Sequence, residues 1–169
     1  MYGERGILKS FQKFDGTPIN EVSQYVEEWL IKYPKGKVAV GTDSLRIKKK
    51  IGYATAIAFF YPSDVEEGSF GKGAHVIYCK VTTRNKLEFW TRLWTEMEHT
   101  REVSESLLEL PIIDIKANLE VHIDINPNDK WDSYRLYKAG VGYFKGMGYN
   151  VVAKPDGWVA KCAADRIVR

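Results

Sequence analysis

Two short apolar runs, each leading to an aspartate, constrain the fold of this chain more than any other feature. Residues 37–44 read KVAVGTDS and residues 119–126 read LEVHIDIN. Such runs are typical of buried strands, and an aspartate near the end of a buried strand lies at the rim of a sheet. A lone aspartate in this place is more often a turn residue. Asp43 and Asp124 are therefore candidates for chemistry mainly as a pair.

The length and composition indicate one ordinary globular domain. The chain has 169 residues, of which 44% are hydrophobic and 28% charged, and these values fit a single core. No window approaches the ~18 consecutive apolar residues of a membrane span, and the first residues lack the apolar segment of a signal peptide. We therefore expect a cytoplasmic protein that does not associate with membranes.

The positive charge is concentrated in one place. The net charge of +3 is too small to indicate a nucleic-acid partner by itself. However, Arg46, Lys48, Lys49 and Lys50 lie together after the first apolar run, where they could contact phosphates. A charged hairpin tip that keeps the protein soluble explains the same residues equally well.

The periodicity predicts an N-terminal extension followed by an α/β domain. Residues 1–36 are expected to form a helical extension packed on the core, with Thr17 as the cap and Pro18 as the first helical residue. Residues 37–169 are expected to form the main domain. Strands are predicted at 37–44, 52–60, 75–83, 119–126 and 149–154, and helices at 85–110, 131–147 and from Gly157 onward.

This order of elements brings the two aspartates together. Helices before and after the fourth strand imply right-handed crossovers, so this strand can lie parallel beside the first. Asp43 and Asp124 would then be neighbours at the edge where α/β sheets usually bind ligands. Two adjacent carboxylates repel unless one is protonated or a cation lies between them. Without a histidine and cysteine cluster, oxygen-binding Mg²⁺ or Mn²⁺ is favoured over zinc.

The helix predicted at 85–110 carries a glutamate on its apolar stripe. Glu96 lies between Leu93 and Val103 on this stripe and should face the core. Glu98 lies about 200° away, at about 100° per residue, and should face solvent. We therefore expect Glu96 to be the functional residue, with Glu98 as the alternative if the helix is rotated.

Taken together, four carboxylates in the segments GTDS, RLWTEMEH, HIDIN and AADR resemble those of the ribonuclease H superfamily. The segments VGTDS, VHIDIN and GMGYNVVAKPDGWVAKCAADR are most similar to the YkuK-type ribonuclease H-like family, across residues 37–169. The resemblance implies an α/β fold with a five-stranded mixed sheet, in the order 3-2-1-4-5, flanked by helices.

The resemblance also implies a nuclease that hydrolyses phosphodiester bonds in RNA or an RNA/DNA hybrid with two Mg²⁺ or Mn²⁺ ions. Asp43 would contact both ions, Glu96 and Asp124 one of them, and Asp165 the other. Asp165 lies about 12 Å along the last helix from its start, so this helix must cross the site obliquely. Asp156 remains the alternative ligand.

Further residues are expected to contact the substrate: Ser44, Arg46, Lys48, Lys49, Lys50, His122 and Lys154. His122 shares the strand face of Asp124 and either assists proton transfer or is a structural histidine. Lys154 either contacts a phosphate or pairs with a carboxylate. The alternative to the nuclease is a non-catalytic nucleic-acid-binding module that keeps the fold and uses residues 46–50.

Overall fold

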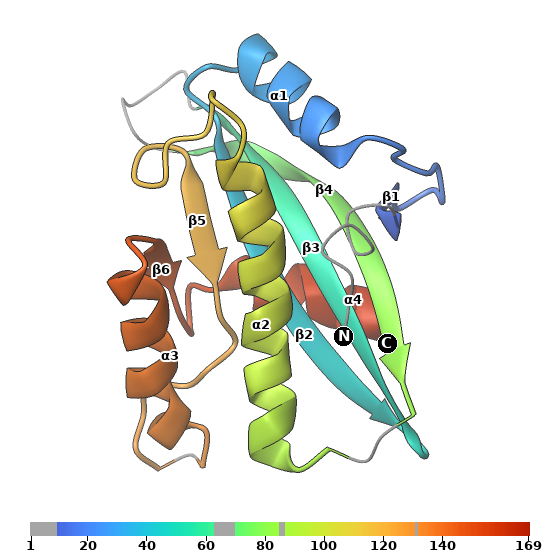
Figure 1. Ribbon diagram of the computed structural model, residues 1–169, viewed down its shortest axis with the longest axis vertical. Helices are drawn as coiled ribbons and strands as arrows, with labels where there is room; N and C mark the ends of the chain where they lie inside the picture. Colours follow the sequence, from blue (N-terminus) through green and yellow to red (C-terminus); the bar gives the residue numbers. More distant parts are fainter. Residues whose placement is uncertain (1–9, 63–69, 85–86, 131) are drawn as a thin grey trace.

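The computed structural model describes residues 10–62, 70–84, 87–130 and 132–169, which form a mixed sheet with helices on both faces (Figure 1). The strands are β1 (Gln12–Lys13), β2 (Lys37–Ile47), β3 (Lys50–Pro62), β4 (Phe70–Thr83), β5 (Leu119–His122) and β6 (Asn150–Val152). The helices are α1 (Val22–Lys32), α2 (Phe89–Leu108), α3 (Tyr134–Gly146) and α4 (Asp165–Val168), and a π-helical turn, η2 (Val159–Ala164), leads directly into α4. Within the described ranges, no helix is both long and apolar enough to span a membrane.

The sheet contains one strand more than the sequence predicted. Its order is β1-β4-β3-β2-β5-β6, with β2, β3 and β4 antiparallel and β5 and β6 parallel to β2. The expectation of five strands in the order 3-2-1-4-5 is wrong in strand count, and hence in the full order. Gln12 and Lys13 pair with Tyr78 and Ile77 and thereby cover the outer edge of β4. A two-residue strand has no alternating pattern by which it could be recognised.

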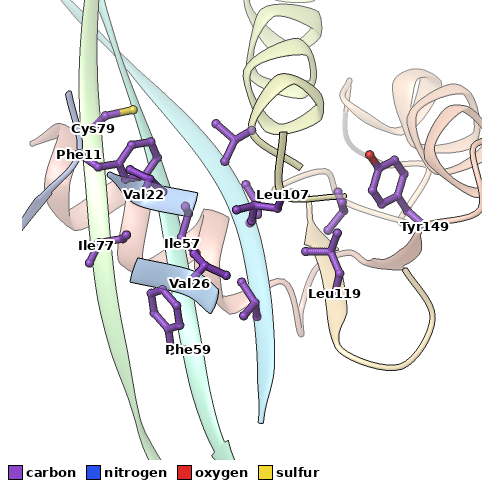
Figure 2. Close-up of a cluster of buried hydrophobic side chains, with 14 of the residues drawn as sticks. Phe11, Val22, Val26, Ile57, Phe59, Ile77, Cys79, Leu107, Leu119 and Tyr149 are labelled. Carbon is purple, nitrogen blue, oxygen red and sulfur yellow. The ribbon is translucent and has the colours of Figure 1, made fainter. Parts of the chain in front are cut away.

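β3 shows how the two faces of the sheet differ. Ala54, Ala56 and Ala58 point to one face, where η2 and α4 approach closely. Ile57 and Phe59 point to the other face and pack beneath α1 and α2. Figure 2 shows this larger apolar cluster between the sheet and its helices. In Figure 1, α1, α2 and α3 lie on the viewer's side of the sheet and α4 lies behind it.

The first helix begins later than predicted. α1 starts at Val22, and Thr17 does not cap it. Instead, the carbonyl of Thr17 accepts a hydrogen bond from the Lys13 N–H, and the Asp15 carboxylate accepts one from the Thr17 N–H. The pairing of β1 with β4 therefore draws residues 12–18 into a tight turn before the helix. The first nine residues of the expected extension lie outside the described residues.

Two boundaries near the candidate site also differ from the prediction. β5 ends at His122, so Asp124 follows the strand instead of belonging to it. The last helical segment begins at Val159 and not at Gly157, and its first turns are π-helical. Gly157 lies in the turn before it, where a Cβ atom would be 2.9 Å from the carbonyl oxygen of Ile123.

Candidate active site

β2 and β5 lie side by side and parallel, and their pairing continues to Gly41 and His122. Beyond this pair both chains reach the same edge of the sheet, as the crossover argument predicted. Asp43 and Asp124 each lie two residues further on. Burial raises the pKa of Asp43, and the negative charge of Asp124 raises it further. The two aspartates are therefore electrostatic neighbours at the carboxyl edge of the two strands.

The C-terminal helical segment reaches this edge because one strand residue has no side chain. A Cβ atom at Gly41 would lie 2.7 Å from the backbone nitrogen of Ala160, so only glycine permits this contact. Further along, Val168 lies over Gly52 of β3. The segment thus crosses the sheet obliquely, as expected. This crossing brings Asp165 close enough to Asp43 for its charge to raise the pKa of Asp43.

On the opposite face, hydroxyl groups attach α2 to the sheet. Thr42, Thr55 and Thr100 form a buried chain with 2.9 Å between successive hydroxyl oxygens. One turn before Thr100, Glu96 is buried with 6% of its surface exposed. Its carboxylate accepts a hydrogen bond from the hydroxyl of Ser44 at 2.5 Å. Because successive residues of a strand face opposite sides, Ser44 faces α2 while its neighbour in β2 faces the C-terminal segment.

The second glutamate of α2 points away from this site. Glu98 pairs with Arg101 at 2.9 Å, and it accepts a hydrogen bond from the Tyr143 hydroxyl at 3.2 Å. The helix is therefore oriented as its apolar stripe predicted. Of the two candidates, Glu96 is the one whose pKa is raised by the charge of Asp43.

Burial, with some contribution from neighbouring negative charge, gives two of the carboxyls unusual pKa values. Burial is the main cause, and it raises the pKa of Asp43 to about 6 and that of Glu96 to about 8. Ser44 opposes both shifts, because its N–H donates to Asp43 and its hydroxyl to Glu96. The charge of Asp124 adds to both shifts, and that of Arg92 reduces them. Without a cation, Glu96 is therefore largely protonated at neutral pH.

The other two carboxylates have internal cations beside them. The Lys154 Nζ lies 2.9 Å from Asp124 Oδ1. This oxygen is buried, and no described residue donates a hydrogen bond of normal geometry to it. The Arg169 Nε lies 2.9 Å from both carboxylate oxygens of Asp165. Asp156, the alternative ligand, is exposed in the turn before the C-terminal segment.

Asp43, Glu96, Asp124 and Asp165 thus converge from the first long strand, the long helix, the end of β5 and the last helix. A family model described as Ribonuclease H-like matches residues 19–169. The chain belongs to the ribonuclease H-like family. This match confirms the resemblance drawn from the sequence, and its range includes α1. Neither the curated proteins nor the solved structures contain a significant match to the chain.

In this ribonuclease H-like site, any metal would be held by carboxylate oxygens, which suit Mg²⁺ or Mn²⁺. Among the described residues, no three carboxylate, histidine or cysteine side chains are already gathered as a ligand group. Two observations nevertheless fit a cation. The buried Oδ1 of Asp124 receives no directed hydrogen bond from the described residues, and negative charge is crowded around Asp43 and Glu96. A divalent ion would neutralise this charge.

The residues expected to bind substrate fall into separate places in the ribonuclease H-like fold. Ser44 and Lys154 lie at the carboxylates, in contact with Glu96 and Asp124. Arg46 and the residues Lys48, Lys49 and Lys50 are exposed at the tip of the β2–β3 hairpin. The tip lies against the start of α2, because the Arg46 Nη2 donates a 3.0 Å hydrogen bond to the carbonyl of Leu87.

His122 occupies a buried position with both ring nitrogens engaged. Its Nδ1 accepts a hydrogen bond from the Val159 N–H, and its Nε2 lies 3.2 Å from the Glu120 carboxylate. Glu120 in turn pairs with Lys37 at 3.3 Å. This network attaches the start of η2 to β5 and supports the structural interpretation of His122. Its role in catalysis stays a prediction.

Two arginines lie one helical turn from these carboxylates, and sequence reasoning assigned no role to the second of them, Arg169. Arg92 lies four residues before Glu96, and Arg169 lies four residues after Asp165. Residues four apart share a face of a helix, so this spacing was the available signal. Arg169 forms an ion pair with Asp165, whereas the charge of Arg92 acts on Asp43 and Glu96 without an ion pair to any of the described carboxylates.

Proposed function

We propose that this protein is a divalent-metal-dependent nuclease that hydrolyses phosphodiester bonds in RNA or in an RNA/DNA hybrid. One observation carries the proposal. Two parallel strands and two helices from opposite faces of a ribonuclease H-like sheet direct Asp43, Glu96, Asp124 and Asp165 to one edge. Four acidic residues held at one edge, two of them with raised pKa values, are more typical of a functional site than of a structural one.

The four carboxylates would hold one or two Mg²⁺ or Mn²⁺ ions. When bound, such ions activate a water molecule and stabilise the charge that develops on the phosphate and the leaving oxygen. The residues of the chain supply the placement of the ligands. Ser44 orients two of them, since its N–H binds Asp43 and its hydroxyl binds Glu96. The proposed reaction needs no nucleophile from the protein.

Lys154 has a place in this proposal beside Asp124. Its side chain pairs with the Asp124 carboxylate but is also 31% exposed, so a ligand in solvent can reach it. With a divalent ion held at Asp124, the Lys154 ammonium group would be free to bind a phosphate of the substrate. Lys154 would then hold the nucleic acid while the carboxylates hold the metal.

A second candidate function rests on the same internal cations. Because Lys154 and Arg169 already neutralise Asp124 and Asp165, the site can persist without a metal. The protein would then be a non-catalytic nucleic-acid-binding module that uses the basic tip of the β2–β3 hairpin. Its binding would weaken as salt is added, since phosphate contacts release counterions.

One experiment separates the two functions. The purified protein is incubated with end-labelled single-stranded RNA, double-stranded RNA and RNA/DNA hybrid in Mg²⁺, Mn²⁺ or EDTA. Cleavage that requires the metal and is lost in Asp43→Asn supports the nuclease, provided that Asp129→Asn, a control at an exposed aspartate, retains it. We would abandon the nuclease if no substrate were cleaved or if Asp43→Asn cleaved normally. Salt-sensitive binding without cleavage, unchanged in Asp43→Asn, selects the binding module.

A further inference from the structure

A second surface of the molecule combines exposed aromatic rings with positive charge. It consists of Phe89 and Trp90 at the start of α2, together with Arg46, Arg92 and residues 48–50. We call it the aromatic–basic surface. The hairpin tip and the start of α2 lie at the same end of the molecule in Figure 1, and the hydrogen bond from Arg46 to Leu87 joins them.

The two aromatic rings are both exposed to solvent, but they differ in their contacts with other side chains. Phe89 and Trp90 are 41% and 37% exposed, although large apolar side chains are usually buried. Their ring centroids lie 5.2 Å apart with 73° between the planes. The guanidinium carbon of Arg92 lies 5.7 Å from the centroid of the Phe89 ring. Phe89 therefore lies between a ring and a cation, whereas Trp90 contacts no second ring or cation within the described part of the chain.

Arg92 connects this surface to the carboxylates. It precedes Glu96 by one helical turn, and its charge lowers the pKa of both Glu96 and Asp43. Its Nε is buried and has no hydrogen-bond partner among the described residues. Trp90 lies six residues before Glu96, which is about 9 Å along the helix axis and about 120° around it. A nucleic-acid strand that runs from the carboxylates to Trp90 would therefore pass around the side of α2 as well as along it.

We propose that the aromatic–basic surface binds a single-stranded segment of nucleic acid, with one base stacked on Trp90 and phosphates held by Arg92 and the hairpin tip. Aromatic side chains stack well on unpaired bases, while the bases of a duplex are already stacked on one another. The basic residues complement the charge of the backbone. The inference rests on the proposed nuclease function for the path of the strand toward the carboxylates, and it names single-stranded nucleic acid as the substrate class.

The test measures binding without catalysis. The fluorescence anisotropy of labelled single-stranded RNA and of a duplex of equal length is followed in EDTA. Trp90→Ala should weaken binding of the single strand by about 5-fold to 150-fold, the range found for loss of one stacked base. Trp90→Phe should restore most of this loss, because it retains a ring. Trp158→Ala should bind normally, since Trp158 is similarly exposed, at 40%, but lies at the start of the C-terminal segment.

A second measurement covers the case in which Trp90→Ala does not fold. Arg92→Gln should reduce by about one the number of phosphates counted from the salt dependence of binding. Two results would overturn the inference: normal single-strand binding by folded Trp90→Ala, or an unchanged salt dependence in Arg92→Gln. EDTA prevents metal-dependent cleavage, so binding and cleavage are measured separately. If binding depends on Trp90 but the wild-type protein cleaves no substrate when Mg²⁺ or Mn²⁺ is added, the nuclease alone is contradicted. If the protein cleaves its substrate but binding does not depend on Trp90, the single-strand inference alone is contradicted.

Discussion

The ammonium group of Lys154 lies 2.9 Å from Oδ1 of Asp124, at an oxygen that no described residue satisfies with a directed hydrogen bond. A cation supplied by the protein itself therefore lies where a metal ligand is proposed. Ammonium and metal would compete for the same carboxylate. Metal binding should consequently respond to a residue that is not itself a ligand.

The first prediction follows from this competition. Lys154→Ala should tighten Mn²⁺ binding by about twofold to fivefold, which corresponds to the ~0.5–1 kcal/mol of a partly exposed ion pair. Isothermal titration calorimetry on the metal-free protein measures the change. Lys161→Ala, which removes an exposed lysine of the C-terminal segment, should leave the affinity unchanged. Weaker binding in Lys154→Ala would show that the lysine supports the metal site.

The second prediction concerns the two glutamates of α2. Glu96→Gln removes a charge from the proposed ligand set but keeps an oxygen that can accept the Ser44 hydrogen bond. Mutation of a residue that only hydrogen-bonds to a metal ligand usually costs about 10-fold to 100-fold in metal affinity or activity. The loss of a direct ligand should therefore cost at least about tenfold. Glu98→Gln is the matched control and should retain full affinity and cleavage. Equal losses in both variants would contradict the assignment of Glu96.

The third prediction is a dependence of stability on pH in the metal-free protein. The pKa of Glu96 rises from 4.5 to about 8 in the folded state, and that of Asp43 from 3.8 to about 6. Between the ordinary and the raised values, the folded state binds more protons than the unfolded state. These two residues should therefore make the free energy of unfolding fall as the pH rises from about 4 to about 8.

The measurement is urea denaturation in EDTA across this pH range, compared with Glu96→Gln. The comparison is needed because two histidines make stability rise with pH instead. Burial is the main cause that lowers the pKa values of His75 and His99. The variant should lose stability less steeply between pH 6 and pH 8 than the wild-type protein does. Added Mn²⁺ should flatten the wild-type curve, since a metal binds only the charged carboxylates. Parallel curves for wild type and variant would refute this account.

The fourth prediction tests the close crossing of the C-terminal segment over β2. Gly41→Ala places a Cβ atom 2.7 Å from the backbone nitrogen of Ala160, and overpacking of this kind usually costs about 1–3 kcal/mol of stability. Gly142→Ala is the control, because among the described residues nothing outside the backbone of its own helix lies within 4 Å of the added Cβ. That change in a helix should stabilise the protein by about 0.5–1 kcal/mol. Thermal or urea denaturation distinguishes the two signs.

The fifth prediction addresses His122. His122→Leu removes the acceptor for the buried Val159 N–H and should cost about 1–3 kcal/mol. His122→Asn keeps an oxygen that can accept this hydrogen bond and should recover part of the loss in the free energy of unfolding. If His122 is structural, a folded His122→Asn variant should cleave at nearly the wild-type rate. A folded variant without activity would instead favour a role in proton transfer.

The parts of the site that depend on strand order and helical period could be predicted from the sequence. Asp43 and Asp124 end apolar runs separated by a helical crossover, and a connection of this kind allows their strands to lie parallel. Glu96 occupies a stripe of apolar residues, which decides the orientation of α2. The roles of these residues in catalysis remain predictions.

Other features depend on long-range contacts that leave no local pattern. Thr17 has the chemistry of a helix cap, but pairing of β1 with the edge of β4 places it in a turn instead. The ion pair of Lys154 with Asp124 likewise joins residues that are far apart in the sequence. The exposure of Trp90 could not be predicted from the sequence either, because large aromatic side chains are usually buried.

Asp43 and Ser44 are consecutive residues of β2, yet their side chains lie toward carboxylates on opposite faces of the sheet. Asp43 lies toward Asp165 of α4, and Ser44 donates to Glu96 of α2. A single residue inserted between Gly41 and Asp43 would exchange the two faces and point each group at the wrong helix. We therefore expect this short segment to tolerate substitutions far better than insertions or deletions. A change of length shifts the alternation of side chains along the strand, and this alternation directs each group to its own face.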